Sequence, residues 1–126
     1  KKSPLPLIAD ENSINSNDVK ALKGIFDGIN IKLMKCGNLF EAMKMIDLAR
    51  ENQMKLMIGC MIESSVAITA ASHLSPLVDF ADLDGNLLIK DDPYIGVKII
   101  DGKIILPKAN GLGVKLSKAA TNNKLK

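Results

Sequence analysis

A lysine within an apolar run is the first candidate for chemistry in this sequence. Lys32 lies inside the run Ile29–Leu33, and Lys35 follows it shortly before Gly37. A lysine among residues that favour β-strands must extend to solvent, pair with an acidic group or serve a functional site. Taken alone, this run is explained by a solvent-exposed lysine on an edge strand. In a closed pocket beside a divalent cation, its charged form would be disfavoured and Lys32 could exchange a proton with carbon. For Lys35 we expect electrostatic support at most.

Acidic residues at two other places suit a divalent cation and a cationic substrate group. Asp10, followed by Glu11, ends a short apolar run and offers hard oxygen ligands for Mg²⁺. A turn aspartate that accepts hydrogen bonds from nearby amides explains that motif equally well. Asp82 and Asp84 are two residues apart, so on a strand they would share a face and suit an ammonium group. Loop aspartates before Gly85 are the alternative interpretation of this pair.

The elements that must position these residues repeat along the chain. Apolar runs begin near residues 7, 29, 55 and 78, with helical patterns between them. This alternation predicts an α/β fold with parallel strands, in a sheet that is covered on both faces. The candidate residues follow the ends of successive runs, as catalytic groups do at the carboxyl ends of barrel strands. The remaining run ends in Gly59-Cys60, followed by Glu63.

Capping residues predict where two of the helices begin. Asn38, with Glu41 three residues later, is close to a capping box for an amphipathic helix. Ser13 or Ser16 would cap a shorter helix around Asp18–Lys23. The apolar residues with helical spacing after Asn38 are Leu39, Phe40, Ala42, Met43, Ile46 and Ala49.

The pattern changes in the last third of the chain. Asp101-Gly102 separates Val97–Ile100 from Lys103–Leu106, which predicts a β-hairpin with a two-residue turn. From Leu116 onward the sequence is polar and lysine-rich, and we expect a frayed tail there.

Composition limits the classes of partner. The chain has 126 residues and a formal net charge of +3, but six of its 17 basic residues lie near the ends and all 14 acidic residues lie between them. This distribution, together with 3% aromatic residues, argues against a nucleic-acid-binding surface. No apolar run is long enough to cross a membrane. Cys36 and Cys60 fit buried thiols in a reducing, cytoplasmic compartment better than a disulfide.

Four motifs together resemble the enolase superfamily, and within it the muconate-lactonizing subgroup with its dipeptide epimerases. The resemblance runs from about Pro4 to Gly113, with the motifs in the family's order and spacing. Departures are small: Asn12 intervenes before Ser13, and Asn38 replaces a second glycine. The motifs are Ala9-Asp10-Glu11-Asn12-Ser13, Asn30-Ile31-Lys32-Leu33-Met34-Lys35-Cys36-Gly37, Ile58-Gly59-Cys60-Met61-Ile62-Glu63-Ser64 and Asp82-Leu83-Asp84.

The resemblance implies a role for each candidate residue. Asp10 would be a Mg²⁺ ligand, and Lys32 the acid/base lysine in proton transfer at an α-carbon through an enolate. Asp82 and Asp84 would bind the α-ammonium group of a dipeptide. Supporting roles would fall to Glu11, Lys35 and Cys60.

The same resemblance implies the fold and its divisions. Residues 1–92 would form strands 5–8 of a (β/α)7β TIM-like barrel with intervening helices, which is its C-terminal half. Residues 93–115 would form a hairpin and segment that return to a capping domain, and residues 116–126 the frayed tail. The other family lysine and two further metal ligands are absent from the sequence, so we expect a partial enzyme that is inactive alone and needs an N-terminal half.

Several alternatives stay open from the sequence. The chain could be a non-catalytic, stand-alone α/β binding module, or have another activity of the superfamily, such as that of muconate cycloisomerase or o-succinylbenzoate synthase. A phosphate at the helix start near Gly37-Asn38 is a further alternative. The complete enzyme is expected to be a homo-oligomer.

Overall fold

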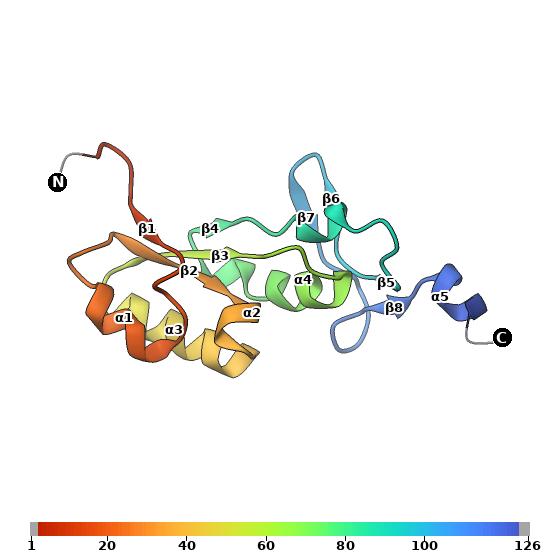
Figure 1. Cartoon of the computed structure of the whole chain (residues 1–126), viewed down its shortest axis with the longest axis horizontal. Helices are drawn as coiled ribbons and strands as arrows, with labels where there is room; N and C mark the ends of the chain where they lie inside the picture. The colour runs from red at the N-terminus through yellow and green to blue at the C-terminus, as the bar shows by residue number, and fades with distance from the viewer. Residues whose placement is uncertain (1–2, 124–126) are drawn as a thin grey trace. The chain divides into compact units, whose positions relative to one another are not determined.

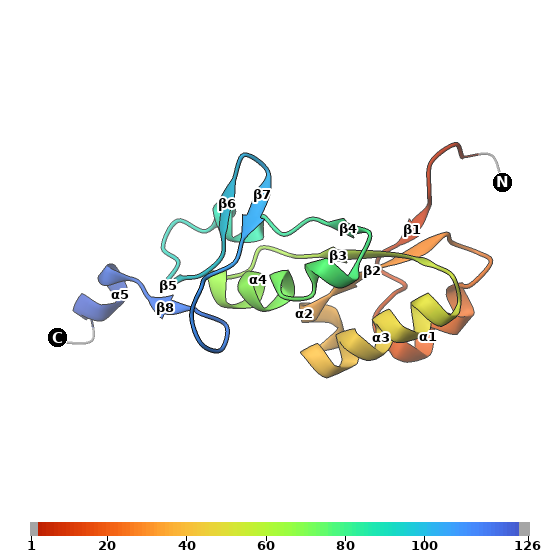
Figure 2. The same ribbon diagram turned by 180° about the vertical axis from the view of Figure 1, so that it is seen from behind.

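The computed structural model describes residues 3–123, which form two compact units. The first unit contains the residues up to 59 and residues 74–82, and the second contains residues 60–73 and those from 83 onward. Figures 1 and 2 show the course of the chain through both from opposite sides.

A parallel sheet of four strands organises the first unit. The strands lie in chain order and are β1 (Ile8–Ala9), β2 (Gly28–Lys32), β3 (Lys55–Gly59) and β4 (Phe80–Ala81). Each neighbouring pair is parallel. The four predicted apolar runs are therefore confirmed as strands, and their carboxyl ends meet at one edge of the sheet.

The two central strands form the core of this unit. In β2, Gly28, Ile29, Asn30 and Ile31 are all buried, rather than every second residue. Continuous burial of this kind is typical of a parallel strand covered on both faces. On one face, helices α1 (Ser16–Leu22) and α3 (Leu39–Glu51) lie side by side (Figures 1 and 2).

Helix α3 begins as predicted and buries part of the predicted apolar face. The Asn38 side chain accepts a hydrogen bond of 2.8 Å from the backbone N–H of Glu41. Phe40, expected in the core, is 88% exposed, whereas Met45 is fully buried. The prediction is confirmed for Ala42, Ile46 and Ala49. It is wrong for Leu39, Phe40 and Met43, which are exposed because they lie beside the stripe that packs. The buried stripe is Ala42, Met45, Ile46 and Ala49, with helical spacing.

The cap of α1 also differs from the prediction. Neither Ser13 nor Ser16 caps the helix; Asn15 does, and its side chain accepts from the backbone N–H of Asn17 at 2.9 Å. The carboxylate of Asp18 accepts from the N–H of Asn15 in return, which completes a capping box. Both serines are buried instead.

A single-turn helix follows strand β2 directly. Helix α2 (Leu33–Cys36) starts where β2 ends, and Gly37 terminates it with a left-handed backbone conformation, φ 88°. The N–H of Gly37 donates to the carbonyl of Leu33 at 2.8 Å. This short turn brings Lys35 back toward the end of the strand.

The second unit contains α4 (Ser65–Ser72), a 3-10 turn (Gly85–Leu88) and small antiparallel sheets. Strands β5 (Tyr94–Ile95) and β8 (Lys115–Leu116) pair with each other, as do β6 (Lys98–Ile100) and β7 (Lys103–Ile105).

The turn between β6 and β7 confirms the predicted two-residue hairpin. Asp101 and Gly102 both have positive φ, 49° and 72°, as a type I′ turn requires. Within the expected frayed tail, Lys118–Asn123 instead forms a short helix, α5. No helix within residues 3–123 is both long enough and apolar enough to cross a lipid bilayer.

Candidate functional site

The site lies at the carboxyl edge of the parallel sheet, where β1 and β2 end. Ala9 pairs with Ile29, so Asp10, the next residue, comes level with Asn30. Lys32 is the last residue of β2. Parallel pairing therefore brings together two residues that are 22 positions apart in the sequence.

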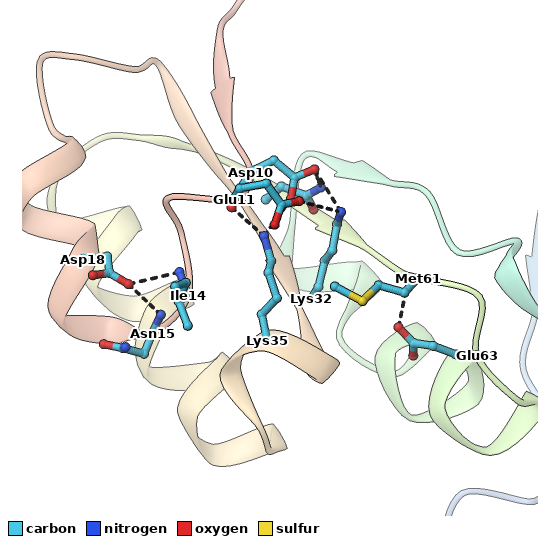
Figure 3. Close-up of polar contacts among 10 residues, drawn as sticks. Asp10, Glu11, Ile14, Asn15, Asp18, Lys32, Lys35, Met61 and Glu63 are labelled. Atoms are coloured by element: carbon cyan, nitrogen blue, oxygen red, sulfur yellow. Dashed lines mark hydrogen bonds and ion pairs between the residues drawn. The ribbon is translucent and has the colours of Figure 1, made fainter.

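Lys32 forms an ion pair with Asp10. Its Nζ lies 3.0 Å from Oδ2 of Asp10 and 3.8 Å from Oε1 of Glu11 (Figure 3). The Lys32 side chain is 14% exposed, against 40% for Asp10 and 76% for Glu11. Lys32 thus has a largely buried stem and an ammonium group directed at the strand-end carboxylate, and not the fully solvated side chain of an edge-strand lysine.

Lys35 binds the same carboxylate from the other side. Its Nζ lies 2.6 Å from Oδ1 of Asp10 and also donates to the backbone carbonyl of Asp10 (Figure 3). Its side chain is only 7% exposed. Lys35 reaches the same carboxylate as Lys32 because β2 ends at Lys32 and the chain turns into α2.

The surroundings of Asp10 favour its charged form. Partial burial acts to raise the pKa of the Asp10 carboxyl group, but hydrogen bonds from Lys35, Lys32 and Asn30 outweigh it and hold that pKa below the ordinary value of 3.8. Asp10 is therefore a carboxylate at neutral pH, and both of its oxygen atoms accept bonds from cations.

Asn30 is a site residue that the sequence analysis missed. Its Nδ2 donates to Oδ2 of Asp10 at 3.1 Å, and the residue is only 4% exposed. The available signal was its position, because asparagine is disfavoured in strands and Asn30 interrupts a run of apolar residues.

Asp82 and Asp84 do not lie on a strand. Strand β4 ends at Ala81, and both aspartates are exposed in the segment that follows. The N–H of Asp82 donates to the carbonyl of Ile58 at 2.9 Å, which continues the sheet by one bond. Of the two interpretations of this pair, loop aspartates before Gly85 is the correct one, because the strand is shorter than the apolar run suggested. Asp82 belongs to the first unit and Asp84 to the second.

Cys60 begins the first segment of the second unit. Cys36 and Cys60 do not form a disulfide, in line with the prediction, but both are partly exposed and not fully buried.

Asp10 suits one position in the coordination sphere of a divalent cation. It is ionised, partly exposed and offers hard oxygen atoms, which Mg²⁺ prefers. The residues that the structure describes contain no cluster of three or more His, Cys, Asp or Glu side chains that could hold a metal ion. Asp10 therefore fits the role of one ligand among several.

Comparison with known proteins identifies the family. A family model described as "Enolase C-terminal domain-like" matches residues 1–120. The L-Ala-D/L-Glu epimerase of Bacteroides thetaiotaomicron is 57% identical over 114 residues, covering 90% of this chain and 30% of the relative. The L-Ala-D/L-amino acid epimerase of Flavobacterium johnsoniae is 45% identical over 116 residues, covering 92% of this chain and 34% of the relative.

Solved structures agree with these relatives. The L-Ala-D/L-Glu epimerase of Bacillus subtilis, in a substrate-liganded complex, is similar with a TM-score of 0.82 and 31% identity, covering 89% of this chain and 33% of that one. A dipeptide epimerase of Cytophaga hutchinsonii, complexed with Mg and the dipeptide D-Ala-L-Val, has a TM-score of 0.83 and 30% identity, covering 94% of this chain and 34% of that one.

These matches confirm the predicted resemblance and fold class. The parallel strands and their helices match part of the barrel of mandelate racemase/muconate lactonizing enzymes. The chain spans about a third of the length of the curated relatives that it matches. This chain belongs to the enolase C-terminal domain-like family.

Proposed function

We propose that this chain supplies the Lys32 side of the active site of a Mg²⁺-dependent dipeptide epimerase, an isomerase that moves a proton at an α-carbon. The observation that carries the proposal is the 3.0 Å contact between Lys32 and Asp10 at the carboxyl edge of a parallel sheet. Active sites of β/α barrels lie at this edge. The relatives named as dipeptide epimerases support the choice of reaction.

Lys32 is the residue that moves the proton. A largely buried ammonium group loses part of its hydration, so its neutral form becomes more accessible and can accept a proton from carbon. Asp10 acts in the opposite direction, because its negative charge favours the ammonium form. Burial and the Asp10 carboxylate therefore act in opposite directions on the charge of Lys32.

Asp10 would hold the metal, with Lys35 and Asn30 fixing its carboxylate. When bound, Mg²⁺ supplies an electrophile that stabilises negative charge on the substrate. Positive charge beside Lys32 would disfavour its ammonium form, so Lys32 would be the group that accepts the proton from the substrate.

The other assignments follow the same proposal. Asp82 and Asp84 would bind the α-ammonium group of the dipeptide, and Glu11 and Cys60 would have supporting roles. Residues 93–115 would contact a capping domain, and the remaining catalytic groups would come from an N-terminal half, in a homo-oligomeric enzyme. The two reduced thiols support a cytoplasmic location.

A complementation experiment tests this function. The chain is mixed with the N-terminal two thirds of the Bacteroides thetaiotaomicron epimerase, Mg²⁺ and L-Ala-L-Glu in D₂O, and exchange of the α-proton is followed by NMR. We expect exchange that is lost in Lys32→Ala and kept in Lys55→Ala, a lysine whose side chain is 55% exposed and lies at the opposite edge of the sheet.

Two results would contradict the proposal. Exchange that persists in Lys32→Ala would assign the base elsewhere. A folded, monomeric chain that shows no exchange with its complement would favour a non-catalytic α/β binding module.

A further inference from the structure

We propose that Asn30, packed against Gly59, is a positioning residue that orients the Asp10 carboxylate for the metal ion. The inference deepens the proposed function and rests on the role of Asp10 as a metal ligand. Asn30 would act through Asp10, to which it donates a hydrogen bond, and not as a metal ligand itself.

The contact with Asp10 is direct and buried. Asn30 lies on the central strand β2, with 4% of its surface exposed, and its Nδ2 donates to Oδ2 of Asp10 at 3.1 Å. The other oxygen of Asp10, Oδ1, accepts from Lys35. Oδ2 also lies 3.0 Å from Nζ of Lys32. Donors on both oxygens therefore fix where the carboxylate lies, which restricts the Asp10 side chain about its Cα–Cβ bond as well as its Cβ–Cγ bond.

Stability alone does not account for an amide at this position. Its Oδ1 is buried and has no hydrogen-bonding partner among the residues that the structure describes. An unsatisfied buried acceptor costs free energy comparable to what a hydrogen bond to a charged group contributes. An apolar β-branched residue would suit a buried strand better. The amide is therefore better explained by what it does to Asp10.

Gly59 provides the space that the amide needs. Gly59 is the last residue of the neighbouring strand β3 and pairs with Lys32 of β2. A Cβ at Gly59 would lie 2.7 Å from Oδ1 and 2.8 Å from Nδ2 of Asn30, closer than real contacts allow. Gly59 is not one of the glycines with positive φ, so space and not backbone conformation requires a glycine here.

An uncharged donor has an advantage beside a cation. Lysine also donates to a carboxylate, but its positive charge opposes the approach of Mg²⁺. The amide of Asn30 orients the same oxygen without that repulsion. Partners that orient metal ligands typically change metal affinity by about 10–100-fold when they are replaced.

The test uses three variants and two measurements. Asn30→Leu removes the donor, Gly59→Ala pushes the amide without changing Asn30 or Asp10, and Asn52→Leu is the control. Asn52 also donates one amide bond, at 2.7 Å to the carbonyl of Leu48, but at the end of α3. In the full chain, three-bond ¹H couplings report the χ1 rotamer of Asp10. In the complemented enzyme, titration calorimetry reports Mg²⁺ affinity.

We expect a single Asp10 rotamer in the unmodified chain and in Asn52→Leu, and averaged couplings in Asn30→Leu and Gly59→Ala. Mg²⁺ affinity should fall about 10–100-fold in the latter two. An unchanged rotamer in both, or averaged couplings with unchanged Mg²⁺ affinity, would overturn the proposal. If one variant fails to fold, solvent exchange of the Asn30 side-chain amide protons is measured in the unmodified chain. Slow exchange supports the hydrogen bond to Asp10, and exchange as fast as that of a solvated amide overturns the proposal.

A different result would contradict the proposed function. That result is the absence of Lys32-dependent α-proton exchange in the unmodified complex. The role of Asn30 is tested by the rotamer of Asp10, which is measured without substrate or turnover.

Discussion

The two edges of the parallel sheet each hold an aspartate with two basic partners, but they differ in what donates to the carboxylate. At the carboxyl edge, the carboxylate of Asp10 accepts from the side chains of Lys32, Lys35 and Asn30. At the amino edge, Oδ2 of Asp79 accepts from the backbone N–H of Leu56 at 2.8 Å.

The basic residues at the two edges also differ in how far their side chains are exposed. Arg50 and Lys55 at the amino edge are 46% and 55% exposed, whereas Lys32 and Lys35 are 14% and 7% exposed. A carboxylate bound to the backbone ties β3 to the start of β4 and has a structural role. One bound only to side chains can exchange a partner for a ligand. Barrel enzymes divide stability and chemistry between the two edges in this way.

The largest effect that this comparison predicts is on catalysis at the carboxyl edge. Lys32→Met should lower α-proton exchange in the complemented enzyme by about 10²–10⁴-fold, the contribution typical of a general acid or base. Its effect on the free energy of unfolding should be about 1 kcal/mol, because Asp10 keeps Lys35 and Asn30. Urea unfolding and NMR exchange measure the two quantities. A loss of stability without a loss of exchange would remove the distinction between the edges.

The next effect is on stability at the amino edge. Asp79→Ala should lower the free energy of unfolding by about 2 kcal/mol, since Leu56 loses a charge-assisted bond and Arg50 its partner at 2.9 Å. Exchange per folded molecule should stay unchanged. Asp82→Ala, at the other end of β4, is the matched control: we expect impaired substrate binding and a stability change within about 0.5 kcal/mol. A reversed pattern would mean that the edges have been assigned the wrong way round.

The pH dependence should isolate the charge of Asp79. The bond from the backbone N–H of Leu56 outweighs burial and, with Arg50, lowers the pKa of the Asp79 carboxyl group from its ordinary 3.8. Because the folded pKa is below the unfolded one, the extra stability is present above pH 3.8 and is lost as pH falls through the folded pKa. The difference between the unmodified chain and Asp79→Asn should be about 1 kcal/mol at pH 7 and should shrink below pH 4. A difference that is constant with pH would exclude the charge as its source.

The smallest effect is expected for Arg50. The Arg50 side chain is 46% exposed and binds Asp79 and the carbonyl of Leu77. Exposed ion pairs contribute about 0.2–1 kcal/mol, so Arg50→Ala should lower the free energy of unfolding by about that amount and leave exchange unaffected. Raising the salt concentration should reduce the difference further. A loss above about 2 kcal/mol would show that the Arg50 pair is not a screened surface contact.

The local elements were predictable from the sequence because they depend on neighbouring residues. The apolar runs predicted the parallel strands, Asn38 predicted the start of α3, and Asp101-Gly102 predicted the hairpin turn. Each signal depends on backbone preferences or on a hydrogen bond within a few residues. The sequence alone therefore determined that Asp10 follows the end of one strand and that Lys32 lies at the end of the next.

Which groups meet was decided only by the tertiary structure. The carboxylate of Glu41 was expected to close the capping box of its own helix, but it accepts from the N–H of Ser16 on α1 at 2.7 Å. The pairing of Lys35 with Asp10 depends on the turn at α2, and the role of Asn30 depends on the register of β1 and on the space at Gly59. A polar side chain bonds to whatever packing brings within about 3 Å, and contacts over long sequence separations are not encoded in local patterns.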